Sequence, residues 1–149
     1  MLLIRPSSRI VKINPDNNSI IYLESVQGFE KNDWCLINTE TSKNYYKIVL
    51  VNTKENSIEI DGVANENWLS YPIVDLGVSG SIGIGINGSK DNSFITPQSI
   101  SVFEFDDVSK RIYPKIVLGK LPEETQYGFA GGSYGLYAEN VLLRGSLVT

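Results

Sequence analysis

Short apolar runs separated by clusters of turn residues restrict the first half of this chain to an antiparallel β-fold. Five runs rich in β-branched and aromatic residues follow one another, and polar clusters such as residues 14–18 (NPDNN) separate them. An amphipathic helical period is hard to find. The pattern predicts hairpin-connected strands that close a small OB-like or SH3-like barrel. The predicted strands are residues 8–13, 19–23, 34–38, 45–51 and 57–60.

The chain divides into two all-β parts by this pattern. We expect the small barrel to occupy residues 1–64. Residues 65–76 hold aromatic side chains among polar ones and predict a loop or a boundary between the parts. Residues 77–149 then form a glycine-rich β region, in which no fixed internal repeat is evident.

The glycine-rich stretch at residues 82–88 (IGIGING) is typical of a strand with two unlike faces. Alternation places three isoleucines, Ile82, Ile84 and Ile86, on one face and two glycines on the other. A bare glycine face predicts close approach by another backbone or a neighbouring subunit. Residues 83–88 also match G-x-G-x-x-G, but neither an amphipathic helix nor a βαβ pattern surrounds them, so dinucleotide binding is disfavoured.

The charge and histidine content exclude several functional classes. The net charge is -4, from 17 acidic and 13 basic residues, and the basic residues are scattered, which disfavours a nucleic-acid partner. Histidine is absent, so the usual general base and the commonest metal ligand are missing. We therefore predict a protein that is not an enzyme and that uses no cofactor and no metal.

The remaining compositional features indicate synthesis in a reducing cytoplasm. The single cysteine, Cys35, cannot form an internal disulfide, and its apolar neighbours predict a buried thiol. The N-terminal apolar run is too short for a signal-peptide core, and no stretch is long enough to cross a bilayer. Membrane insertion is not expected.

Two sets of side chains are candidates for a functional site near the middle of the chain. Trp68 and Tyr71, in the expected loop, suit either core packing or stacking on a sugar ring. Glu104 and Asp106 lie on one face at the end of an apolar strand and could form a glycosidase carboxylate pair. A solvated strand end leading into a turn explains that second pair better, because aspartate often marks turns.

Residues 113–149 carry a family resemblance. The segment contains PKIVLG at residues 114–119, a glycine-rich turn, and YGLYAENV at residues 134–141, which leads into LLRG. These motifs resemble a segment of the tail-fibre and tail-tip proteins of phages and prophages of low-GC bacteria. The resemblance covers about a quarter of the chain, and the fibre-forming repeats that usually follow are absent from it.

The resemblance implies a structural part of a virion tail, made in the bacterial cytoplasm and contributing to host attachment. It implies a homo-oligomer, most often a trimer, that contacts other tail proteins and that could present a site for a host cell-surface glycan. The residues expected at the oligomer interface are Tyr134, Tyr137, Val141, Leu143 and Leu147.

Two other functional hypotheses remain open. The chain could be a stand-alone carbohydrate-binding or adaptor module that uses Trp68 and Tyr71 as its platform. It could also be a glycan hydrolase that uses Glu104 and Asp106 as its acid and nucleophile.

Overall fold

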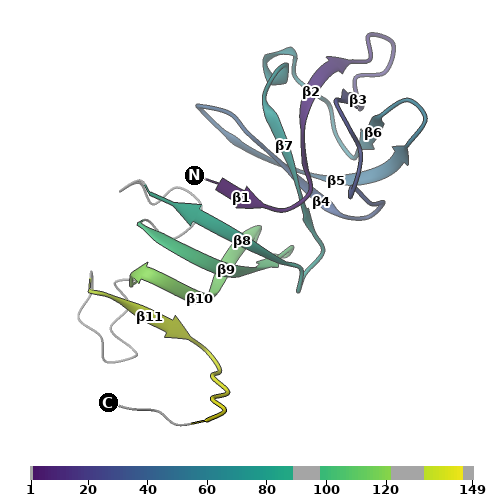
Figure 1. The fold of residues 1–149 in the computed structure, drawn as a ribbon. Coiled ribbons are helices and arrows are strands. Elements are labelled where there is room, and N and C mark those ends of the chain that lie inside the picture. The colour runs from purple at the N-terminus through teal and green to yellow at the C-terminus, as the bar shows by residue number, and fades with distance from the viewer. Residues whose placement is uncertain (1, 89–97, 122–132, 146–149) are drawn as a thin grey trace. The chain divides into compact units, whose positions relative to one another are not determined.

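The described part of the chain is built almost entirely of β-strands, so the all-β prediction is confirmed. The structure is a computed structural model that describes residues 2–88, 98–121 and 133–145. Its strands form a closed barrel and a second, five-stranded sheet (Figure 1). They group into two compact units, one comprising residues 4–81 and 105–111 and the other residues 1–3, 82–104 and 112–149.

The barrel contains six antiparallel strands in the order β2-β3-β6-β5-β4-β7. Five of them match the predicted strands closely, which confirms the small N-terminal barrel. Their bounds are β2 Ser7–Ile13, β3 Ile20–Leu23, β4 Trp34–Asn38, β5 Lys43–Asn52 and β6 Ser57–Ile60. The sixth strand is β7, Pro72–Gly77.

Strand β2 closes the barrel because it pairs with two neighbours along its length. Its first half pairs with β7, from Ser7 opposite Val74 to Arg9 opposite Pro72. Its second half pairs with β3 from Ile10 onward, and a register shift lies within this pairing, between Ile10 and Lys12. Such an irregularity bends a strand and increases its twist, which lets one strand serve both sides of a barrel.

The segment predicted as a loop or boundary, residues 65–76, belongs partly to the barrel. It begins with a 3-10 turn, Glu66–Trp68, which Asn65 caps by accepting a hydrogen bond from the backbone N–H of Asn67. Strand β7 follows and pairs with both β2 and β4. The barrel therefore extends past residue 64 and needs its sixth strand to close.

Isoleucine side chains dominate the barrel interior. In β5 the buried Ile48 lies between exposed residues, as a period of two requires, whereas three successive residues of β4, Cys35, Leu36 and Ile37, are all buried. The fully buried isoleucines are Ile10, Ile21, Ile37, Ile48, Ile58 and Ile73. Cys35 is free and fully buried beside them, as its apolar neighbours predict.

The second sheet has the strand order β1-β8-β9-β10-β11. Its strands are β1 Leu2–Ile4, β8 Ile82–Asn87, β9 Ser99–Asp106, β10 Arg111–Lys120 and β11 Tyr134–Ala138. The antiparallel pair β8 and β9 places Ile84 opposite Val102, and the pair β10 and β11 places Leu118 opposite Leu136. These two registers determine which side chains share a face.

Candidate functional site

One face of the second sheet is apolar and exposed. Directly paired residues of antiparallel strands point to the same side, so the two registers align a set of large aliphatic side chains. Each of them exposes between 39% and 62% of its surface. We call this set the apolar face; it comprises Ile82, Ile84 and Ile86 of β8, Ile100 of β9, Ile116 and Leu118 of β10, and Leu136 of β11.

The opposite face of the same sheet is buried and is lined by small residues and rings. Gly83 is directly opposite Phe103, and Gly85 is opposite Ser101; all four are buried. A phenyl ring across from a glycine fills the space that the missing side chain leaves. The predicted alternation of isoleucine and glycine faces is present, but the isoleucine face is the exposed one.

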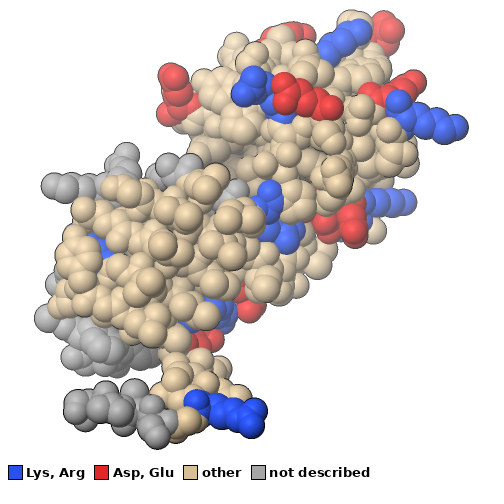
Figure 2. Space-filling model, in the orientation of Figure 1, with Lys and Arg blue, Asp and Glu red and all other residues tan. Residues whose placement is uncertain are grey.

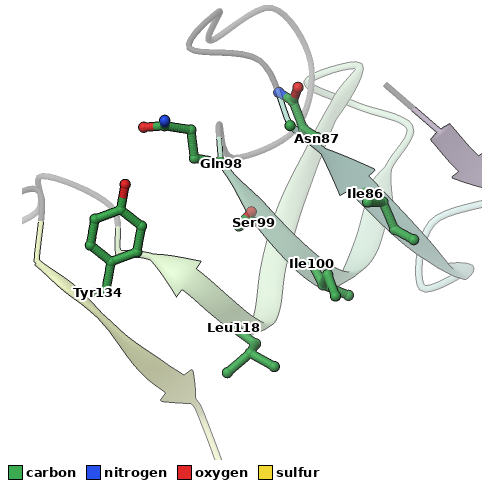
Figure 3. A pocket seen from close by; sticks show the side chains of 8 residues that line it. Ile86, Asn87, Gln98, Ser99, Ile100, Leu118 and Tyr134 are labelled. Carbon is green, nitrogen blue, oxygen red and sulfur yellow. The ribbon is translucent and has the colours of Figure 1, made fainter.

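An open hollow of about 390 Å³ lies where the ends of β8 and β9 meet β10 and β11 (Figure 3). Its lining combines apolar side chains with amides, a hydroxyl and one phenol ring. The lining residues are Ile86, Asn87, Gly88, Gln98, Ser99, Ile100, Leu118 and Tyr134. Ile86, Ile100 and Leu118 all line the hollow, and the residues on the other side of these strands, such as Phe103 and Val117, are buried; β8, β9 and β10 therefore present the apolar face on the same side of the sheet.

The residues expected at an oligomer interface lie on β11 and just after it. Tyr134 and Leu143 are about 70% and 67% exposed, and Val141 is similarly exposed. Tyr137, opposite Val117 of β10, is half-buried. Leu147 lies outside the described residues.

Leu142 was not among the expected interface residues, yet it is 96% exposed. Residues 140–144 follow β11 without regular secondary structure. Exposing these aliphatic side chains to water is costly, because fully burying one of them would stabilise the protein by roughly 1.5–3 kcal/mol. This run extends the exposed apolar surface beyond the sheet.

Charged side chains are sparse on this sheet, and three of them, Glu104, Lys115 and Glu139, lie close together. Lys115 Nζ is 3.1 Å from a Glu139 carboxylate oxygen and 3.9 Å from Glu104. In the face shown in Figure 2, the charged side chains gather over the barrel, and the surface over β8 to β11 is largely uncharged. The apolar face itself is therefore suited to an apolar partner.

The sequence left two roles open for Trp68, core packing and stacking on a sugar ring, and in the structure Trp68 packs in the core. It is only 5% exposed and belongs to the barrel core, where its ring lies 5.5 Å from that of Tyr46. Tyr71 is half-buried and packs against the same core. A ring in this position offers no face on which a sugar could stack, so the pair does not form an exposed platform.

The two carboxylates considered for glycan hydrolysis occupy ordinary structural positions. Asp106 accepts hydrogen bonds from the hydroxyl and backbone N–H of Ser109, from the backbone N–H of Val108 and from the Ser79 hydroxyl. These bonds, led by those from Ser109, lower the pKa of Asp106. These bonds hold the carboxylate in the turn that follows β9, so Asp106 has the turn-forming role that its sequence context favours.

An acidic pair with one fully buried member lies in the barrel unit, and sequence analysis missed it. The Asp75 side chain is fully buried and accepts a 2.7 Å hydrogen bond from the backbone N–H of Gly77. Arg5 Nη2 lies 3.4 Å from the same carboxylate oxygen, and the other oxygen accepts a bond from the backbone N–H of Glu30. Burial, reinforced by the nearby Asp33 carboxylate, raises the pKa of Asp75 to about 7. Burial also raises the pKa of Asp33, which hydrogen-bonds to Asp75.

The sequence contained a signal for two of the features that were missed, the buried acid and the apolar face. A charged residue within IVDL, residues 73–76, indicates an aspartate on a strand that is otherwise apolar. Alternating isoleucines in β8 together with aliphatic residues at alternate positions of three later strands indicate a shared face, but only once the strand pairing is known. The lining residues Asn87 and Gln98 carry no comparable signal.

The described residues contain no cluster of three or more His, Cys, Asp or Glu side chains that could hold a metal ion. Within the same part of the chain, no helix has the length and apolar character needed to cross a membrane. Comparisons with family models, with curated proteins and with solved structures found no match to this chain.

Proposed function

We propose that the chain is a structural component of a phage tail, in a fibre, a tip or a baseplate-associated part, with a role in host-surface attachment. The observation that carries this proposal is the apolar face, together with the exposed run at residues 141–143. A chain that leaves so much aliphatic surface uncovered fits an assembly in which partner chains complete its core.

The segment that resembles tail proteins supports the same proposal. Its PKIVLG motif lies within β10 and its YGLYA motif forms β11, and the two strands pair from Ile116 opposite Ala138 to Lys120 opposite Tyr134. The resemblance therefore covers a physical unit, a pair of antiparallel strands that contributes Leu118 and Leu136 to the apolar face. The resemblance implies three kinds of partner. They are identical copies of the chain in a trimer, other tail proteins, and a glycan of the host surface.

Immuno-electron microscopy tests this proposal. Phage particles purified from the bacterium that carries the gene are labelled with an antibody against the chain. We expect gold particles at the tail and the chain among the virion proteins by mass spectrometry. Particles that lack both the label and the chain would refute a virion role.

A stand-alone carbohydrate-binding or adaptor module is the second candidate, and the hollow favours it. Tyr134 exposes about 70% of its surface, and the half-buried Gln98 also lines the hollow with its amide (Figure 3). An exposed ring with an amide nearby suits a sugar, which offers apolar and hydrogen-bonding faces. Sedimentation with purified cell-wall glycan tests it: the wild type should co-sediment and Tyr134→Ala should not. The Tyr71→Ala variant, altered in the barrel, is the control.

A further inference from the structure

The size of the apolar face indicates what covers it. Its seven aliphatic side chains each expose 39% to 62% of their surface and Tyr134 exposes 70%, so their summed exposed area is on the order of the 800 Å² that one partner contributes to a standard protein–protein interface. The largest apolar patch on a typical monomer is smaller, about 300–600 Å². The face is therefore large enough to support a stable complex by itself.

The shape of the face limits the kind of partner. β-Branched side chains at alternate positions of neighbouring strands form parallel rows with shallow grooves between them. Two such sheets pack face to face about 10 Å apart, with the rows of one lying in the grooves of the other. A matching partner therefore presents another row-and-groove sheet face, and the chain itself carries one.

The charge distribution favours a second copy over a charged surface. Ile84, Ile86 and Ile100 at the centre have no ionisable neighbour opposite them on the paired strand. Glu104 and Lys120 lie at the margin, opposite Ile82 and Tyr134. Two copies would thus bring no like charges together at the centre of the contact. A membrane surface or a nucleic acid would require a basic rim, and the chain has a net charge of -4.

We infer that the apolar face packs against the apolar face of a second copy of this chain, with Ile84, Ile100 and Leu118 at the centre of the contact. This inference rests on the proposed function, in which identical chains assemble, and it names the surface that joins them. Because the same face serves both copies, a face-to-face contact closes with two chains, whereas in a trimer three such faces meet around one axis.

Light scattering on a size-exclusion column, across a wide range of concentrations of the full chain, tests the inference. The wild type should have a mass above that of a monomer. Leu118→Glu should shift dissociation to at least tenfold higher concentration, because the contact would bury a carboxylate without a partner. The matched control is Leu50→Glu in β5 of the barrel, since Leu50 and Leu118 are 53% and 55% exposed. The control should associate as the wild type does.

A second variant and a dye measurement guard against loss of folding. Ile84→Glu introduces the same charge on β8, and far-UV circular dichroism checks that each variant retains its strands.

An apolar fluorescent dye needs no variant: its emission per chain should rise as the wild type is diluted and the apolar faces separate. A wild type that is monomeric at every concentration would overturn the inference. An oligomer that both face variants leave intact would overturn the surface assignment.

These outcomes are separate from the test of the proposed function. A chain found in purified tails but unaffected by Leu118→Glu and Ile84→Glu would keep its virion role and lose this surface. A chain absent from tails that still associates through the face would keep the surface and lose the virion role.

Discussion

The ring of Trp68 lies against that of Tyr46 inside the barrel, with ring centroids 5.5 Å apart and planes inclined by 52°. The tilted arrangement lets the edge of one ring approach the face of the other, which is favourable beyond the apolar area that it buries. The contact joins the 3-10 turn that precedes β7 to strand β5. Trp68 thus ties the connection that leads to the sixth strand to the rest of the barrel.

Replacing Trp68 by alanine should therefore destabilise the fold. We expect Trp68→Ala to lower the free energy of unfolding by about 3–5 kcal/mol, because it removes a buried ring and leaves a cavity. Urea denaturation followed by circular dichroism measures this change. Tyr134→Ala, at an exposed ring of the second sheet, should stay within about 0.5 kcal/mol of the wild type. Equal effects of the two variants would contradict the core position of Trp68.

Gly62 allows the Tyr46 ring to take this position. A Cβ atom at Gly62 would overlap with Cε1 of the Tyr46 ring, well inside van der Waals contact. Gly62→Ala should cost about 1–3 kcal/mol through overpacking, and the signal of the Tyr46–Trp68 pair in near-UV circular dichroism should change. Gly88→Ala is the control, because no heavy atom of the described residues, its chain neighbours aside, lies within 4 Å of the corresponding Cβ position. An unchanged midpoint of urea denaturation for Gly62→Ala would show that the Tyr46 ring moves aside without a loss of stability.

Cys35 should be inert in the folded protein. Its side chain is fully buried, and burial raises the pKa of the thiol far above its ordinary value, so almost no thiolate forms near neutral pH. An aromatic disulfide reagent should react with less than one thiol per chain over an hour in buffer, and with one per chain in denaturant. Rapid reaction of the native chain would mean that β4 opens readily.

The fold could be predicted from sequence where the periodicity was local. Five barrel strands were found because each alternates within a few residues and ends at turn residues. Strand β7 was missed because PIVDLG, residues 72–77, begins with proline and contains aspartate, two residues that weaken a strand pattern. Barrel closure depends on pairing β7 with β2, a contact between residues far apart in the chain, and no local pattern encodes it.

The candidate site could be predicted only in part, for the same reason. The alternation in β8 separates Ile84 from Gly85, but it does not reveal which of the two faces is buried. The buried face is identified by Phe103 of β9, which is paired opposite Gly83 and covers the glycine side. Trp68 was ambiguous because an amphipathic ring suits a core and a binding surface equally well, and only its burial separates the two.

The buried acid Asp75 should make stability depend on pH in the direction opposite to an ordinary salt bridge. Burial raises its pKa from an unfolded value of 3.8 to about 7, so the folded chain holds a proton that the unfolded chain has already released between these values. The contribution of Asp75 to the free energy of unfolding is therefore fully present below about pH 4 and is lost as the pH rises toward about 7. Three charged groups share the site, namely Arg5, Glu30 and Asp33.

Asp75→Asn isolates this effect, because an amide can keep the bond from the Gly77 N–H and cannot ionise. The difference in unfolding free energy between the variant and the wild type should grow in favour of the variant from about pH 4 to 7, by at most about 4 kcal/mol, and then level off. Denaturant titrations at several pH values measure it. Glu24→Gln, at an exposed carboxylate, should leave the pH profile unchanged. A difference that shrinks over this range would mean that Asp75 is ionised in the fold and held by Arg5.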